Sequence, residues 1–204
     1  MIKYIFFDFD GVITLNENAY SLVPENIHKY YPEIPLEQIN KCYRPHVKTL
    51  QIGQKTHFDL WDEYCKCLNK SLPQSALMKA FRDTPLNEDI ISLIKKVSKK
   101  YQIGIISNNT EERLQTLLDQ FNIANLFNTI SLSSQVGSTK NDKKIFEKAL
   151  LESKIRANEA IFIDNNKENL EIPQRMGFYT YFFDLKKNDT HEMEKYFHSL
   201  GLKF

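Results

Sequence analysis

The residues best suited to chemistry stand at the ends of short apolar runs. Such runs are typical of buried strands, and in a parallel α/β sheet the carboxyl ends of the strands form the ligand-binding edge. Carboxylates, a hydroxyl, amides and an ammonium that converge at that edge could together bind a ligand and act on it. The candidates are Asp8 and Asp10 after the first run, Ser107 and Asn108 after the second, Lys140 ahead of a helical pattern, and Asp164 with Asn165 after a later run.

Each of these residues has a simpler interpretation when it is considered alone. An Asp, Asn or Ser that follows a strand commonly caps the next helix by accepting a backbone hydrogen bond. Helix capping does not require two acids separated by a single residue, as in Asp8-Phe9-Asp10, directly ahead of a long insert. The combination therefore favours a functional site over a set of unrelated caps.

The elements that must position these residues alternate regularly along most of the chain. Apolar runs predict strands at 4–9, 103–107, 129–132, 161–164 and 178–183, of which the third is the weakest. Between these runs, apolar residues recur three and four positions apart, as on a helix that buries one face. Alternating strands and helices predict an α/β fold with a doubly wound parallel sheet.

The segment that separates the first strand from this array contains no convincing strand. Trp61, Tyr64 and Leu68 share one predicted helix face, and Leu77 and Phe81 share another. We therefore expect two domains, an α/β core of residues 1–14 and 86–204 and an all-helical cap of residues 15–85, inserted after the first strand.

Glycine and cysteine usage excludes several kinds of site. The six glycines are widely spaced, the closest pair being Gly177 and Gly201, so neither a dinucleotide-binding nor a P-loop pattern fits. Histidines and cysteines lack zinc-binding spacing. Cys42, Cys65 and Cys67 are odd in number and too few for a disulfide framework, which suits a reducing compartment.

Composition indicates a folded protein without a general affinity for polyanions. The 204 residues are 42% hydrophobic and 26% charged, which is ordinary for a folded domain. The 27 basic and 26 acidic residues nearly cancel, so no overall field favours nucleic acid or an anionic membrane. The first apolar run reaches Asp8 too soon for a membrane span or a signal peptide. We expect a cytoplasmic protein with no nucleic acid and no membrane as partner, and the oligomeric state stays open.

The order of the candidate residues resembles the haloacid dehalogenase (HAD) superfamily of phosphohydrolases over nearly the whole chain. The resemblance implies a Rossmann-like core with a small helical cap directly after the first motif. Among capped members, the layout looks closest to the sugar-phosphate and phosphoglycolate phosphatases. The motifs are Asp8-Phe9-Asp10-Gly11-Val12-Ile13, the strand Ile105-Ile106-Ser107-Asn108-Asn109, Lys140 followed by Asn141 where many members have proline, and Asp164-Asn165, where a second acid is common.

The resemblance also implies roles for the paired acids. Asp8 would attack phosphorus to form an aspartyl phosphate, and Asp10 would protonate the leaving oxygen before activating the hydrolytic water. An acid at residue 10 favours phosphoryl transfer over dehalogenation, because an alkoxide leaving group needs a proton and a halide does not.

The remaining motif residues would neutralise the phosphate and hold a cation. The expected cofactor is Mg²⁺, since oxygen ligands of this kind suit it better than zinc. Its ligands would be Asp8, the carbonyl of Asp10 and Asp164, with Asn165 as a further candidate, while Ser107, Asn108 and Lys140 would bind phosphoryl oxygens.

We therefore expect a Mg²⁺-dependent phosphatase that acts on a small phosphorylated metabolite such as a sugar phosphate. A phosphomutase of the β-phosphoglucomutase type and a catalytically inactive family member that binds a partner stay as alternatives. A receiver-type signalling domain uses similar residue types, but it is shorter and has no cap. In the cap, Arg44, His46 and Lys48 are the candidates for contacting substrate, although a solvated charged stretch is their simpler interpretation.

Overall fold

The structure, a computed structural model, describes all 204 residues and is built around one parallel sheet. Its strand order is β3-β2-β1-β4-β5, and all four neighbouring pairs are parallel. The predicted α/β fold with a doubly wound parallel sheet is confirmed. The strands are β1 (Tyr4–Phe7), β2 (Gln102–Ser107), β3 (Thr129–Leu132), β4 (Ala160–Asp164) and β5 (Tyr179–Phe182).

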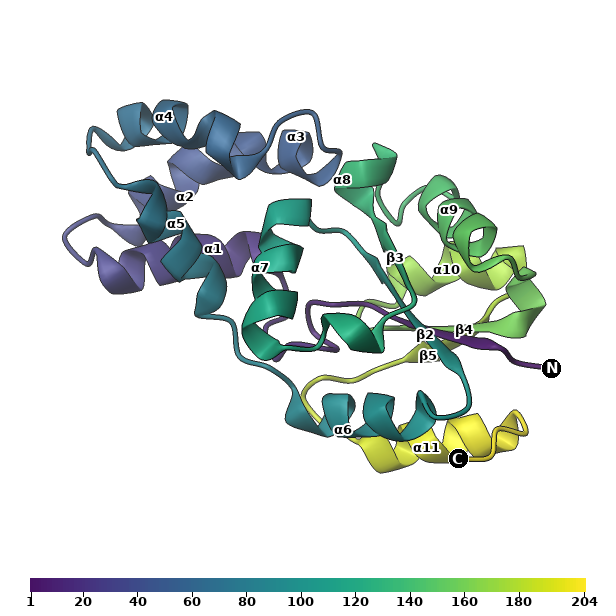
Figure 1. Cartoon of the computed structure of the whole chain (residues 1–204). Coiled ribbons are helices and arrows are strands. Elements are labelled where there is room, and N and C mark those ends of the chain that lie inside the picture. The colour runs from purple at the N-terminus through teal and green to yellow at the C-terminus, as the bar shows by residue number, and fades with distance from the viewer.

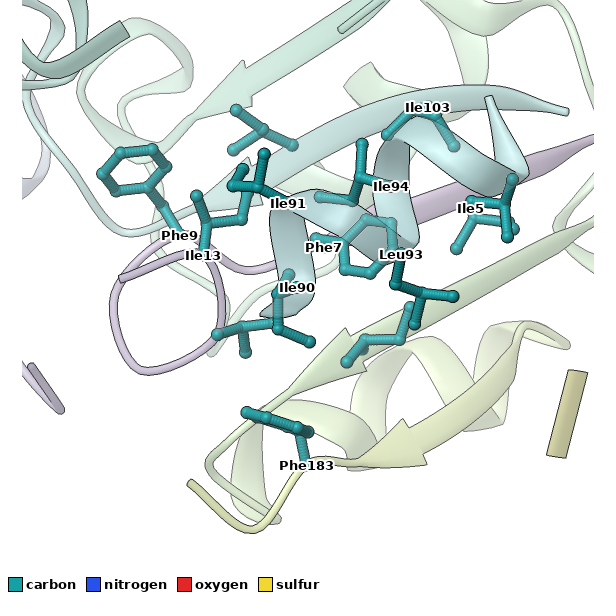
Figure 2. Close-up of a cluster of buried hydrophobic side chains, with 14 of the residues drawn as sticks. Ile5, Phe7, Phe9, Ile13, Ile90, Ile91, Leu93, Ile94, Ile103 and Phe183 are labelled. Atoms are coloured by element: carbon teal, nitrogen blue, oxygen red, sulfur yellow. The ribbon is translucent and has the colours of Figure 1, made fainter. Parts of the chain in front are cut away.

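Helices cover both faces of the sheet, because the inner strands are apolar on both sides (Figure 1). One face packs against α6 (Glu88–Val97), α7 (Glu111–Phe121) and α11 (Thr190–Ser199). Figure 2 shows this layer, where Ile91 and Ile94 of α6 gather over Phe7 of β1. The other face packs against α9 (Lys144–Ser153) and α10 (Glu168–Met176), which follow the short α8 (Ser133–Val136) in the chain.

The strand order reverses beside β1, at the centre of the sheet. From β1 the chain passes outward through β2 and β3, and then it returns to β4 on the other side of β1. The helices that follow β1 and β4 in the core, α6 and α10, pack on opposite faces of the sheet, and such a reversal is where open α/β sheets bind ligands. Phe7 pairs with Ile163, so Asp8 and Asp164, each the next residue along, meet at the same edge.

Five helices between β1 and α6 lie together as one unit beside the sheet (Figure 1), and they share an apolar core of their own. Its 16 buried residues form a cluster separate from the two that cover the sheet, and Trp61 anchors it by donating to the Leu72 carbonyl at 2.9 Å. At the base of this unit, the outgoing and returning segments pair at Thr14 and Leu86. The helices are α1 (Ala19–Tyr30), α2 (Leu36–Tyr43), α3 (Val47–Gln51), α4 (His57–Leu68) and α5 (Gln74–Arg82). We call this unit the cap. No helix in the chain is both long enough and apolar enough to cross a membrane.

The cap contains a disulfide that the number of cysteines did not predict. A bond joins Cys42, near the end of α2, to Cys67, near the end of α4, and Cys65 is free. The interpretation of the cysteines as reduced thiols is corrected here. The packing of α2 on α4 brings together two residues 25 apart in the sequence, and a count of cysteines does not reveal such packing.

Candidate active site

Asp8, Asp164 and Lys140 form a buried ion cluster at the carboxyl ends of β1 and β4. The Lys140 Nζ atom lies 2.6 Å from Oδ2 of Asp8 and 2.6 Å from Oδ2 of Asp164, and no side chain of the three is more than 9% exposed. The other Asp8 oxygen accepts the Phe9 backbone N–H at 2.7 Å, while Oδ1 of Asp164 accepts from the Asn169 amide at 3.1 Å. Each carboxylate is thus fixed on one side by Lys140 and on the other by a neutral donor.

The cluster holds more negative than positive charge. Burial raises the pKa of Asp8 to about 7, and the nearby Asp164 and Asp10 add to this effect against the opposing Lys140. Burial disfavours the Lys140 ammonium as well, but the two carboxylates outweigh it and hold the pKa of Lys140 above its ordinary value. One ammonium therefore serves two carboxylates beside a third, and an additional cation would stabilise the ionised form of Asp8.

Asp10 lies in different surroundings, where neutral and cationic donors surround its carboxylate. Arg113 from α7 donates to both oxygens, at 3.0 Å to Oδ2 and 2.9 Å to Oδ1. Asn109 donates to Oδ2 at 2.9 Å and Asn16 to Oδ1 at 2.8 Å. Arg113 is 1% exposed, so solvent screens this bidentate pair little. Together with a longer hydrogen bond from the Thr14 hydroxyl at 3.4 Å, these contacts fix the orientation of the carboxylate.

Arg113 was not among the residues predicted for the site, although the sequence carries one signal for it. Arg113 directly precedes Leu114, Leu117 and Leu118, which form the buried face of α7. An arginine on a buried face needs an anionic partner, because burial of an unpaired charge is costly. The partner lies 103 residues away in the sequence, so only the folded chain identifies it as Asp10.

Ser107 and Asn108 lie where β2 reaches the same edge of the sheet. Ser107 ends the strand and is 1% exposed. The Asn108 side-chain oxygen accepts the backbone N–H of Lys140 at 2.8 Å. Asn108 therefore fixes the loop that carries Lys140.

Asn165 packs directly against Gly11 of the first motif. A Cβ atom on residue 11 would lie 2.1 Å from the Asn165 amide nitrogen, and Gly11 has φ of +80°. Only glycine tolerates both this contact and this backbone conformation without strain.

All the predicted core residues of the site line one polar cavity of about 250 Å³, except that Asp164 lies beneath it in contact with Lys140. The cavity is also lined by cap residues that the sequence analysis did not select. These are Glu17, Asn18, Ala19, Tyr20 and Gln51.

The structure places Arg44, His46 and Lys48, the predicted substrate contacts of the cap, outside the lining of this cavity. Arg44 lines a shallow hollow on the outer side of α2, and His46 lines a small apolar cavity inside the cap. Lys48 is exposed, and Gln51, close to one helical turn further along α3, is the member of this segment that reaches the active-site cavity.

The donor set fits a magnesium ion. The chain has no cluster of three or more His, Cys, Asp or Glu side chains that could enclose a metal. Mg²⁺ in proteins commonly takes only one or two carboxylates and completes its shell with water and phosphate oxygens. Asp8 and Asp164 supply two carboxylates that share one ammonium, and the excess negative charge around Asp8 favours a divalent cation there.

His57, at the start of α4 in the cap, forms hydrogen bonds with Glu112 of α7 in the core. The His57 backbone N–H and Nδ1 both contact one oxygen of Glu112, at 2.9 Å and 2.7 Å, and Nε2 lies 2.8 Å from the Tyr43 hydroxyl. Burial lowers the pKa of His57 although Glu112 opposes the shift, so the ring is neutral and donates from Nδ1. The first turn of α4 is thereby fixed to the helix that carries Arg113.

Comparison with known proteins identifies the family. Residues 5–182 match the model of the haloacid dehalogenase-like hydrolases. The chain belongs to this family. An uncharacterized hydrolase of Schizosaccharomyces pombe is 24% identical over 212 residues, which cover 92% of each chain.

Solved structures of this hydrolase's relatives share its fold. The wild-type HAD family enzyme BT-2542 of Bacteroides thetaiotaomicron, in complex with magnesium and inorganic phosphate, is 18% identical with a TM-score of 0.73, over 94% of this chain and 99% of that one. A HAD-like family hydrolase of Porphyromonas gingivalis is 22% identical with a TM-score of 0.76, over 96% of this chain and 98% of that one. The L-2-haloacid dehalogenase of Xanthobacter autotrophicus is 15% identical with a TM-score of 0.62, over 88% of this chain and 76% of that one. The family thus contains both phosphate-binding and dehalogenating relatives of this fold.

Proposed function

We propose that this HAD-like hydrolase is a Mg²⁺-dependent phosphatase that cleaves a small phosphomonoester through an aspartyl phosphate on Asp8. The observation that carries the proposal is the contrast between two carboxylates that are separated by a single residue. Asp8 lies in an ion cluster and has a pKa raised to about 7, whereas Asp10 accepts five hydrogen bonds from neighbouring side chains. Paired carboxylates with such different environments are typical of a division between two catalytic roles.

Asp8 is the nucleophile in this mechanism. Its Oδ1 accepts one backbone N–H and its Oδ2 accepts from Lys140, so the side chain cannot rotate away from the cavity that it lines. A carboxylate approaching a phosphate dianion meets a repulsion of roughly 4 kcal/mol per pair of unit charges at 4 Å and an effective dielectric of about 20. The Lys140 ammonium offsets part of this repulsion. A Mg²⁺ ion held by Asp8, the Asp10 carbonyl and Asp164 would supply the remaining positive charge.

Asp10 is the general acid and base in this mechanism. Arg113 and Asn109 hold its carboxylate in place, where it can act as the base that activates water. The donors around Asp10 occupy the lone pairs of its carboxylate oxygens, which leaves no free position for a proton. One donor must therefore rotate away before Asp10 can carry a proton to the leaving oxygen. This second carboxylate supports phosphoester cleavage over dehalogenation, since a departing halide needs no proton.

The test measures release of phosphate from a generic aryl phosphate with and without Mg²⁺. We expect activity that is lost with a chelator and restored by Mg²⁺, and loss of activity in Asp8→Asn with the fold intact by circular dichroism. Glu25→Gln, an exposed substitution on α1 that removes the same charge, serves as the matched control. Turnover by Asp8→Asn within tenfold of wild type would contradict the assignment of the nucleophile.

Asp10→Asn separates the acid role from a structural one. Alkyl phosphates have a poor leaving group that depends on protonation, whereas aryl phosphates depend on it less. We therefore expect a larger loss of kcat on an alkyl phosphate than on the aryl phosphate. Equal losses on the two substrates would argue against a proton-donating role for Asp10.

A further inference from the structure

The active-site cavity has an unequal distribution of charge. Its four acids are Asp8, Asp10, Glu17 and Glu168, and its only cationic side chain is Lys140. The first two acids belong to the phosphoryl-binding end, while Glu17 comes from the segment entering the cap and Glu168 from the first turn of α10. Most of the other lining side chains are neutral amides, namely Asn18, Gln51, Asn108, Asn141, Asn165, Asn166 and Asn169.

No positive charge is available for a second anion in this cavity. Lys140 is buried between Asp8 and Asp164 at 2.6 Å from each. Arg113 is bound to Asp10, and Lys167 lies over the Phe182 ring at 4.8 Å and lines a different hollow.

Cations elsewhere in the cap do not reach the cavity either. Arg44, His46 and Lys48 lie outside it. Lys55 is exposed and its closest acid is Glu63, at 4.0 Å. Apart from Asp8, Asp10 and Lys140, the charged side chains that line the cavity are therefore the carboxylates of Glu17 and Glu168, and most of their neighbours are neutral amides.

We infer that the leaving alcohol of the substrate carries hydroxyl or ammonium groups and no second anionic group. Hydroxyl and ammonium groups donate hydrogen bonds to the oxygens of Glu17, Glu168 and the amides. A carboxylate or a second phosphate would lose water and meet like charges without a counter-ion, which disfavours binding. This inference rests on the proposed phosphatase function, and it excludes a phosphoglycolate-type substrate.

A matched series of two-carbon phosphates tests the inference. The compounds are 2-hydroxyethyl phosphate, 2-aminoethyl phosphate and 2-phosphoglycolate, which share a CH2–O–phosphate group and carry on it CH2OH, CH2NH3⁺ or COO⁻. Each is measured by phosphate release and, in parallel, as a competitor of aryl phosphate hydrolysis at constant Mg²⁺. We expect the hydroxyl and ammonium compounds to exceed 2-phosphoglycolate at least tenfold in kcat/KM or in affinity as competitors.

Charge-neutralising variants identify the residues responsible. Glu17→Gln and Glu168→Gln should each raise the ratio of kcat/KM, or of competitor affinity, for 2-phosphoglycolate over 2-hydroxyethyl phosphate by about threefold or more. Glu25→Gln removes the same charge from an exposed position on α1 outside the cavity and should leave this ratio unchanged. A salt titration adds a second readout, because screening should reduce the discrimination in wild type.

The outcomes separate this inference from the proposed function. If the aryl phosphate is hydrolysed but 2-phosphoglycolate equals or exceeds the other two compounds, the inference fails and the phosphatase assignment stands. If the variants leave the ratio unchanged, the two glutamates do not select the substrate and the inference fails in the same way. If no phosphate ester is hydrolysed in the presence of Mg²⁺, both fail.

Discussion

Replacing Arg113 by methionine tests the ion pair beneath Asp10. Methionine is similar in length and in helix propensity, so the change removes charge and hydrogen bonds with little effect on α7 itself. Two bonds of 2.9 Å and 3.0 Å disappear, and a buried carboxylate loses its only cationic partner. Breaking a buried ion pair on one side typically costs about 3–5 kcal/mol, a large part of the roughly 5–15 kcal/mol that stabilises a folded domain.

A double-mutant cycle with Asp10→Asn assigns that loss to the pair. Each single substitution leaves one buried charge unpaired, whereas the double variant removes both charges. We therefore expect the double variant to lose less free energy of unfolding than the sum of the single losses, by about 2 kcal/mol or more. Urea unfolding near neutral pH measures all four proteins. Arg175→Met is the control, because Arg175 is 69% exposed and contacts Glu171 at 3.6 Å, so we expect a change of at most about 1 kcal/mol.

Activity provides the second readout for Arg113. If Arg113 positions Asp10, its loss should lower kcat on an alkyl phosphate more than it raises KM, because the proton donor is misplaced while the phosphoryl-binding residues are intact. A coupling energy below about 0.5 kcal/mol would refute the pairing. A kcat unchanged in a folded Arg113→Met variant would refute the positioning role.

Three further predictions follow from local features. Gly11→Ala should lower the melting temperature more than Gly201→Ala does. Both glycines have a positive φ, but only at residue 11 would the added Cβ meet a neighbouring atom, at 2.1 Å. Equal decreases in melting temperature would exclude the steric contact as the cause. Thiol titration of the denatured protein should find one free thiol before reduction and three after it. Reduction of the Cys42–Cys67 disulfide should lower the free energy of unfolding by about 3.5 kcal/mol, according to the chain-entropy relation for a separation of 25 residues. Because burial lowers the pKa of His57, the unfolded chain binds the proton more readily, so stability should fall as pH drops below about 6.5. His57→Gln should flatten this dependence in unfolding measurements at pH 5.5 and 7.5, and an unchanged slope would contradict it.

Much of the fold was predictable because its signals are local. Each strand is a short apolar run, and each core helix shows apolar residues at helical spacing, so neighbouring residues suffice to recognise them. Parallel strands then bring their carboxyl ends to one edge, which explains why Asp8, Asp164 and Lys140 could be assigned to one place before any distance was known.

The rest depends on packing between distant segments, which a linear pattern does not encode. The sequence by itself determined the α/β core, the helical insert and the candidate acids, because these follow from residue type and periodicity. Only the tertiary structure decided that Arg113 binds Asp10 across 103 residues and that Cys42 pairs with Cys67. It also decided that Gln51, rather than Lys48, reaches the cavity, since side-chain direction is set by how the cap helices rest on the core. Such contacts arise when independently predictable elements dock, and the geometry of that docking is a property of the whole chain.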